Sequence, residues 1–167
     1  MVPSSPPALP SALGGHEALL LPRLLWAASH DRHEQAIAAG RLQLVTALAV
    51  GVLAYDPRAH ALRPLCKLDL RIPREATHPQ RGFELVYIAT IQRADAGSRR
   101  AVAAVDAAAI GARVERLCAA CGLWLSPRGP LEARALEARL ALEAPRFVSF
   151  VQSIGWTDEL QTPAFPH

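Results

Sequence analysis

The stretch AVAAVDAAAIGARVERLCAACGLWLSPRG, residues 101–129, decides the fold of this chain. Up to Cys121 it is almost all alanine and other apolar residues, and its larger apolar side chains recur at steps of three and four. This spacing predicts a core helix of about twenty residues, from roughly Arg100 to Cys121. Gly122 suits the left-handed backbone position just past a helix C-terminus, so we expect the helix to end there. The residues of the repeat are Ile110, Val114, Leu117, Cys118 and Cys121.

A second helical pattern lies upstream, within residues 16–40, where Gly40 offers a stop. We expect Pro22 in the first turn of this helix or at a break, because a proline ring in a helix interior costs stability. Trp26 is interpreted as a core aromatic residue, as is Tyr87 further along the chain. The apolar stripe of this helix comprises Leu20, Leu24, Leu25, Trp26 and Ala28.

Beyond Gly40 the pattern changes to that of strands. Residues 42–48 and 52–55 are strand-like, and together with a proline turn at residues 56–59 they predict an antiparallel meander. Residues 71–82 combine two prolines, a glycine and many charges, which is typical of a surface loop. Residues 83–91 follow as a buried strand, since they are apolar, β-branched and aromatic.

The C-terminal part of the chain predicts one more helix and one more strand. Gly129 followed by Pro130 is the signature of a helix N-terminus, which opens a short helix over residues 129–142. Residues 146–156 alternate well enough to close a sheet. The order of elements predicts an α+β fold, with helices against a mainly antiparallel sheet and a long central core helix. The predicted domain covers residues 16–157, between a disordered Pro/Ser-rich tail at 1–15 and a C-terminal tail at 158–167.

Composition narrows the classes of function. The chain has 167 residues and a net charge of +3, and its arginines are scattered rather than clustered, which argues against a nucleic-acid partner. Its apolar runs are interrupted by charges before they reach the length of a membrane span, and the N-terminus does not resemble a secretory signal. Three cysteines are too few and too odd in number for a disulfide framework. We therefore expect a cytoplasmic protein with reduced cysteines and no membrane contact.

Two local patterns suggest chemistry but have simpler interpretations. Cys118 and Cys121, together with His30 and His33, contain enough ligands for a tetrahedral zinc site. The alternative, which the pattern favours, is that the two cysteines fill a helix face as small apolar residues. Asp106 is interpreted as a residue that caps the central helix or favours its dipole, rather than as an acid or base. We therefore expect neither a metal ligand set nor a catalytic side chain.

Four motifs in order resemble the nitroreductase superfamily, specifically its SagB-type branch. They are GVLAYDP at Gly51–Pro57, DAAAIGARVERLCAACGL at Asp106–Leu123, RGPLEARALEARLAL from Arg128, and QSIGW at Gln152–Trp156. The segment LLWAA at Leu24–Ala28 also resembles a helix that precedes the flavin loop of that family. The resemblance covers roughly residues 19–156.

The resemblance implies a nitroreductase-like fold and an FMN-dependent oxidoreductase that transfers hydride between a reduced donor and a small organic substrate. It also implies a homodimer with flavin at the subunit interface and the central helix in the dimer core. Carried over to this sequence, Gly122 and Leu123 would approach the flavin ring through main-chain atoms. Trp124 would flank the ring, Arg128 would neutralise charge on the flavin or its substrate, and Gly129 would complete the cofactor-binding set.

The sequence departs from the family where the FMN phosphate should be held. An opening similar to RRSxR and a loop similar to TAPSAxN are absent, and Ala112 and Arg113 replace the QN of the family's central helix. This N-terminal FMN-binding region is therefore degenerate. Either an arginine has taken over the phosphate, or the protein is a non-catalytic relative that has lost tight flavin binding and acts as a partner subunit or binding module. The candidate arginines are Arg32, Arg41, Arg113 and Arg128.

Overall fold

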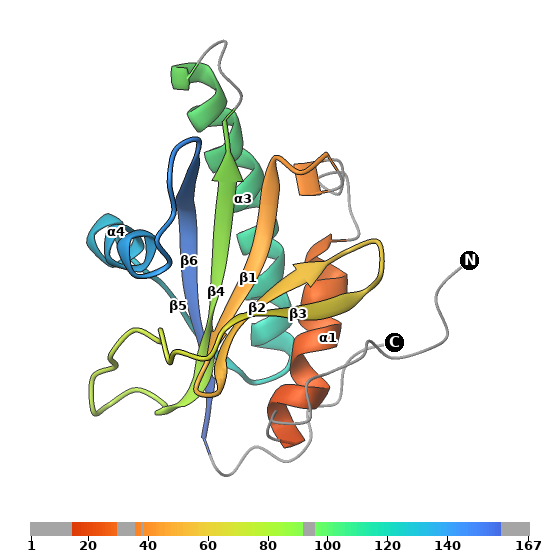
Figure 1. Cartoon of the computed structure of the whole chain (residues 1–167). Helices are drawn as coiled ribbons and strands as arrows, with labels where there is room; N and C mark the ends of the chain where they lie inside the picture. Colours follow the sequence, from red (N-terminus) through yellow and green to blue (C-terminus); the bar gives the residue numbers. More distant parts are fainter. Residues whose placement is uncertain (1–14, 30–35, 38, 92–95, 158–167) are drawn as a thin grey trace.

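Alternating apolar residues build the strands of one antiparallel sheet, which organises the protein. A computed structural model describes residues 15–29, 36–37, 39–91 and 96–157. Its strands are β1 (Leu42–Leu48), β2 (Gly51–Asp56), β3 (Ala61–Cys66), β4 (Arg81–Thr90), β5 (Trp124–Pro127) and β6 (Arg146–Trp156). They form a six-stranded sheet in the order β3-β2-β1-β4-β6-β5, in which every neighbouring pair is antiparallel (Figure 1).

The two faces of the sheet are covered differently. Helices α1 (Gly15–Ser29) and α3 (Ala96–Ala120) lie together behind the sheet in Figure 1 and bury the larger core cluster against it. The opposite face is covered by α4 (Pro130–Arg139) and by parts of the segment 67–80, whose Leu70 and Ile72 pack against a second, smaller cluster. We call the face covered by α1 and α3 the helical face, and the face covered by α4 and the segment 67–80 the front face.

Helix α3 is longer than predicted and is buried on one side only. It begins at Ala96, so Asp106 lies in its middle, and the predicted capping role of Asp106 is wrong. Gly111 lets the helix approach β6 closely, because a Cβ at this position would lie 2.6 Å from the Phe150 ring. On the opposite side Val102 and Val105 are 53% and 65% exposed, so neighbours within this chain do not enclose the helix all round.

The end of α3 confirms the backbone prediction for Gly122. This residue has φ +68°, its N–H donates to the Ala119 carbonyl at 3.2 Å, and the N–H of Leu123 donates to the Cys118 carbonyl at 2.8 Å. These two bonds form a Schellman motif, which satisfies carbonyls that a helix end leaves open.

Helix α1 corrects three predictions. It ends at Ser29 rather than at Gly40. Pro22 lies inside the helix rather than in its first turn or at a break. The chain remains helical because Leu20, Leu21, Leu24 and Leu25 are all buried against the sheet, and this packing offsets the loss of one backbone hydrogen bond. Trp26 is 36% exposed and lies away from the core, whereas Tyr87 is fully buried as predicted.

The strands agree closely with the sequence patterns, with one exception. β1 and β6 have the predicted bounds, and β2 and β4 differ from prediction by one or two residues at their ends. The exception is β5, which pairs with β6 at the edge of the sheet, where the sequence suggested a turn. Among the described residues, no helix combines the length and the apolar character that a membrane span needs.

Candidate functional site

Strand β5 divides the predicted site residues between the two faces of the sheet. Trp124 and Ser126 pair with Gly155 and Ser153 of β6, and alternation along the strand puts both side chains on the front face. Arg128 continues this alternation just past the strand, since its N–H donates to the Val151 carbonyl at 2.9 Å. Leu123, 8% exposed, and Leu125 pack instead into the core on the helical face.

A buried polar row lies beside these residues on the front face. Register places Glu84 of β4 opposite Ser153, and Ser153 opposite Ser126. Glu84 is completely buried, and its carboxylate accepts a short hydrogen bond from the Ser153 hydroxyl. A second carboxylate oxygen lies 3.4 Å from the Arg74 guanidinium, which is itself only 4% exposed. A buried carboxylate is expected to have such partners, because an unpaired one would cost several kcal/mol.

Arg74 reaches this position because two glycines leave room for it. Gly82 and Gly155 pair across β4 and β6, and a Cβ on either one would lie within 2.7 Å of the Arg74 guanidinium. The pKa of Arg74 is lowered, mainly because burial disfavours its charge. Besides Glu84, the guanidinium donates hydrogen bonds to the backbone carbonyls of Pro79, Arg81, Phe83 and Ile154. Arg74 therefore fastens the segment 67–80 to the sheet.

Trp124 packs against the segment 67–80. The His78 ring is 4.8 Å from the Trp124 ring, centroid to centroid, with the planes tilted by 35°. The Arg74 guanidinium carbon lies 5.5 Å from the same centroid, which is within the range of a cation–π contact. The half-buried tryptophan thus joins the edge strand to the segment 67–80.

Arg128 is held in place by the polar row. Its Nε donates to the Ser153 hydroxyl at 2.6 Å, and Ser153 in turn donates to Glu84. The Nη2 atom of Arg128 is buried and has no hydrogen-bond partner among the described residues. A buried guanidinium nitrogen without an acceptor is uncommon in proteins and calls for an explanation.

The glycines of the predicted site have different local roles. The N–H groups of Gly122 and Leu123 are already donated within the helix cap, so these residues have no free main-chain donor to offer a ligand. Gly129 is the N-cap of α4, with φ −78°, a conformation that any residue adopts. A Cβ on Gly129 would approach only the flexible end of Glu132, at 3.0 Å. Local backbone geometry therefore does not require glycine at position 129.

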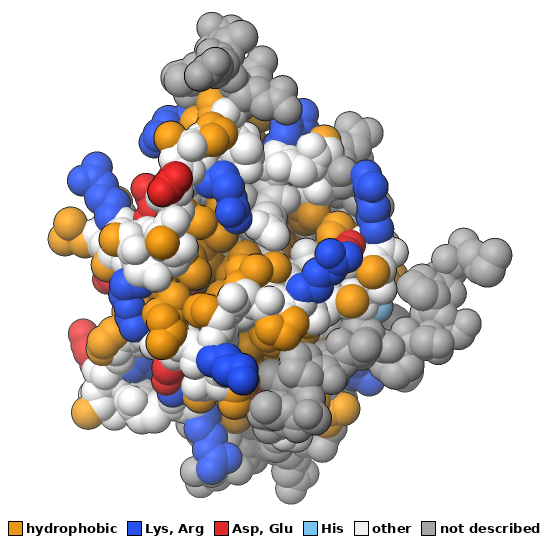
Figure 2. Space-filling view, viewed as in Figure 1, with side chains coloured by type: hydrophobic (Ala, Val, Ile, Leu, Met, Phe, Trp, Pro, Cys, Tyr) orange, Lys and Arg blue, Asp and Glu red, His pale blue; other side chains and the backbone are white. Residues whose placement is uncertain are grey.

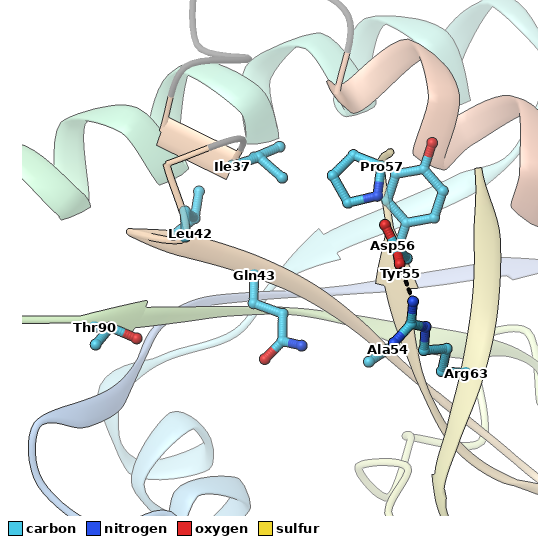
Figure 3. A pocket seen from close by; sticks show the side chains of 10 residues that line it. Ile37, Leu42, Gln43, Ala54, Tyr55, Asp56, Pro57, Arg63 and Thr90 are labelled. Atoms are coloured by element: carbon cyan, nitrogen blue, oxygen red, sulfur yellow. Dashed lines mark hydrogen bonds and ion pairs between the residues drawn. The ribbon is translucent and has the colours of Figure 1, made fainter. Parts of the chain in front are cut away.

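The two larger hollows described on the surface lie elsewhere, whereas two smaller ones, of about 320 and 290 Å³, border the cluster at Gly82 and at Arg74. One cleft of about 360 Å³ is lined by Ile37 and Leu42 on one side and by Pro57 and the Asp56–Arg63 ion pair on the other (Figure 3). A neighbouring cleft of about 460 Å³ includes Arg41, one of the candidate phosphate ligands. Arg113 lies on α3, partly exposed, and Arg32 lies outside the described residues. The structure therefore links Trp124 to Arg128 through Arg74, Glu84 and Ser153, and it does not bring Arg41 or Arg113 to this cluster.

The cysteine pair at the end of α3 lies in the core. Cys118 is fully buried and Cys121 is 6% exposed, and both are free thiols. Burial raises the pKa of Cys118 to about 12, which disfavours the thiolate that a metal ligand needs. The described residues contain no group of three or more metal-ligating side chains, and His30 and His33 lie outside them. The geometry supports the interpretation of the two cysteines as core residues.

The low reactivity expected of the buried Cys118 thiol can be measured by alkylation. At pH 8, a thiol of pKa about 12 has about a thousandfold less thiolate than one of pKa 9.0. We expect iodoacetamide to label the half-buried Cys66 of the native protein long before Cys118, as followed by peptide mass spectrometry. In denaturant the two should react alike. Equal rates in the native protein would contradict the buried position of Cys118.

Sequence patterns did not identify four residues of the front-face cluster around Trp124 and Arg128. They are Arg74, His78, Glu84 and Ser153. Glu84 carried a usable signal, because it is the single charged residue in the apolar run FELVYIAT of β4. Arg74 and His78 lie in a polar loop segment where many residues look alike, and Ser153 carries no signal in the sequence.

Comparison with known structures identifies the architecture. The structure is similar to that of a candidate nitroreductase from Ralstonia eutropha JMP134, with TM-score 0.70 and 26% identity over 83% of this chain and 72% of that one. It is also similar to the E. coli microcin synthetase McbBCD with truncated pro-MccB17 bound, at TM-score 0.66 and 14% identity, covering 83% of this chain and 63% of that one. A candidate nitroreductase from Anabaena variabilis ATCC 29413 gives TM-score 0.61 and 16% identity, covering 79% of this chain and 32% of that one. No protein-family profile and no curated protein matches the sequence.

The similarities agree with the element order found above, including the antiparallel sheet and the long helix α3 packed behind it. At 14% and 16% identity, the second and third likenesses concern the fold alone. The chain has a nitroreductase-like α+β fold.

Proposed function

We propose that this protein is a nitroreductase-like, FMN-dependent oxidoreductase of the SagB-type branch that acts on a small organic substrate. The observation that carries the proposal is the similarity to the Ralstonia candidate nitroreductase, which combines TM-score 0.70 with 26% identity over most of the chain. The four sequence motifs support the finer assignment to the SagB-type branch. The three free cysteines fit a reducing compartment, and we propose the cytoplasm as the location.

The residues around β5 fit one part of a flavin. A flavin ring is flat and carries polar atoms along one edge, so it needs an apolar wall, a close main-chain approach and a hydrogen-bond donor. Trp124 offers an aromatic wall, Gly129 offers backbone without a side chain, and Arg128 offers a donor with no partner among the described residues. The described residues near this cluster do not include a set of donors for the phosphate.

In this proposal FMN, when bound, would accept a hydride and pass it on. The residues of the chain would position the reactants and set the charge around them. Arg128 would stabilise negative charge at the edge of the site, and its orientation would be set by its bond to Ser153. Trp124, already covered by His78 and Arg74, would restrict water on one side. No acid or base from the chain is assigned.

The decisive experiment is flavin uptake. We expect the purified protein to be yellow, with flavin absorbance bands, and to release FMN on denaturation, or else to take up added FMN with quenching of the flavin fluorescence. A colourless protein that binds no added FMN would contradict the proposal. It would favour the alternative, a non-catalytic relative with the same fold that acts as a partner subunit or binding module.

Gly129 provides a sharper test of where the flavin lies. We expect Gly129→Ser to keep or slightly raise stability, because serine is a better helix N-cap than glycine by a few tenths of a kcal/mol. The added side chain should nevertheless weaken FMN binding about tenfold or more by blocking close approach of the ring, as measured by fluorescence titration.

Gly15→Ser is the matched control, because Gly15 has open space around its Cβ position and also stands at the start of a helix. Its FMN titration should match that of the wild type. If Gly129→Ser binds FMN as tightly as this control, the flavin does not lie against Gly129.

We also propose that the protein is a homodimer through the exposed side of α3. Val102 and Val105 are exposed there, and the neighbouring solvent-facing residues of the helix are small, which suits close helix packing. Exposed valines on one helix face are costly to leave in water, at roughly 25 cal/mol per Å² of apolar surface.

Val105→Arg is expected to convert this dimer to a monomer, because a charge would have to be buried at the centre of the interface. The matched control is Leu131→Arg, at another exposed apolar helix residue that lies in α4 on the front face. Light scattering coupled to size-exclusion chromatography measures the mass. A wild-type monomer, or a Val105→Arg dimer as tight as the wild type, would rule out this interface.

A further inference from the structure

The cluster of Arg74, Glu84, Ser153 and Arg128 carries a net positive charge. Arg74 and Arg128 contribute two positive charges to the cluster, and Glu84 contributes one negative charge. Glu84 is paired with Arg74 through an ion pair in which both side chains are at least 96% buried. Arg128 reaches Glu84 only through the hydroxyl of Ser153, and its charge lowers the pKa of Arg74. Within the described part of the chain, Arg128 therefore has no ion-pair partner of its own.

The same place lacks acceptors as well as negative charge. The Arg128 Nη2 atom, which can only donate, is buried without a partner among the described residues. An unsatisfied buried donor destabilises the folded state, and more so when the donor is charged. The unpartnered nitrogen of Arg128 indicates that a group with acceptor oxygens would fit there.

Arg128 is also held in one orientation, as a binding group should be. Its backbone N–H is tied to Val151, and its Nε is tied to Ser153. Ser153 is fixed in turn by Glu84, which Arg74 holds. A guanidinium with Nε occupied still offers its two terminal nitrogens, the pair that binds carboxylate and phosphate oxygens. Arg128 as a whole is half-buried, and its Nη2 atom is buried.

We propose that Arg128 is an oxyanion-binding residue, and that the cluster Arg74–Glu84–Ser153 positions it to hold the carboxylate or phosphate of a small molecule. Within the proposed function, the carboxylate would belong to the organic substrate and the phosphate to the cofactor. Binding of the oxyanion would supply the acceptor that Nη2 lacks and the negative charge that the two arginines need. The inference rests on the proposed function only in naming these two sources.

Four probes distinguish the sources. Benzoate carries a carboxylate and inorganic phosphate carries the phosphate oxygens, and calorimetry measures the binding of each. FMN and riboflavin differ by the phosphate alone, and fluorescence titration measures each of them. The variants are Arg128→Ala and, as the matched control, Arg134→Ala, which removes an exposed arginine from α4. Ser153→Ala is a third variant, which keeps the charge but removes the bond that orients it.

A substrate carboxylate predicts that benzoate binds the wild type and that its dissociation constant rises about 10- to 100-fold in Arg128→Ala, but not in Arg134→Ala. A cofactor phosphate predicts the same rise for inorganic phosphate and FMN, with riboflavin unchanged. Ser153→Ala should give a smaller loss in the same direction. If Arg128→Ala does not fold, as judged by circular dichroism, the loss in Ser153→Ala decides the question.

The proposal is overturned if the wild type binds none of the four probes, or if the variants bind them as the wild type does. Equal losses of FMN and riboflavin in Arg128→Ala would also overturn it, because Arg128 would then act on the ring, but the proposed function would stand. Conversely, benzoate binding that depends on Arg128 in a protein that binds neither flavin would support the oxyanion site and remove the proposed function.

Discussion

Glu84→Ala is expected to destabilise the protein by about 3 kcal/mol, at the lower end of the range for breaking a buried ion pair. The substitution leaves the Arg74 guanidinium, 4% exposed, without its negative partner. It also removes the acceptor of the Ser153 hydroxyl, which is buried as well. The loss stays at the lower end because Arg74 keeps its bonds to four backbone carbonyls.

Urea unfolding measures this effect through the midpoint and slope of the transition. Glu84→Gln should lie between the wild type and Glu84→Ala, since an amide can still accept from Arg74 while lacking the charge. The control is Glu143→Ala at an exposed glutamate, expected within about 0.5 kcal/mol of the wild type. A loss below about 1 kcal/mol for Glu84→Ala would show that Arg74 does not depend on this carboxylate.

Gly82→Ala is expected to have the largest effect, a loss of about 4 kcal/mol or more, which is most of the stability of a domain at the lower end of the usual range. Gly82 has φ +149°, a conformation that disfavours any side chain. A Cβ there would overlap the backbone carbonyl of Ile154 on the paired strand and lie 2.6 Å from the Arg74 guanidinium. The backbone carbonyl cannot move aside without breaking the β4–β6 pairing.

Gly155→Ala separates the two causes of this strain. A Cβ at Gly155 would meet the Arg74 guanidinium at 2.7 Å and the Arg81 carbonyl at 2.9 Å. Arg74→Ala should therefore relieve part of the cost of Gly155→Ala, so that the double variant is less destabilised than the sum of the singles. The control is Gly15→Ala, with open space around its Cβ position. Strict additivity would mean that the guanidinium does not occupy the space above the glycine pair.

Local signals determined much of the fold, because they report what the backbone can do within one or two turns. Gly122 ends α3 in a left-handed conformation, and Gly129 with Pro130 starts α4, as their chemistry predicts. The alternation in residues 146–156 likewise marked β6 with its observed bounds. These signals, together with the order of motifs, were enough to indicate the nitroreductase-like fold that the structure shows.

Other features could not be derived from local patterns, because packing against distant residues overrides local preference. Pro22 is tolerated inside α1 because the buried leucines of this helix pack against the sheet. The exposure of Trp26 depends on which face of α1 packs against the sheet. The segment around Trp124 became an edge strand only because β6, some 30 residues later, was available to pair with it.

The sequence alone therefore indicated the helices and four of the six strands, placed the end of α3 and the start of α4, and singled out Trp124, Arg128 and Gly129 as candidate site residues. The tertiary structure alone decided their surroundings. Strand register brings Glu84 and Ser153 beside Arg128. The glycine pair leaves room for Arg74, which donates to the carbonyl of Ile154, a residue 80 positions later in the chain. Charge compensation depends on distances between side chains that the chain brings together only by folding, whereas helix and strand boundaries depend on neighbouring residues.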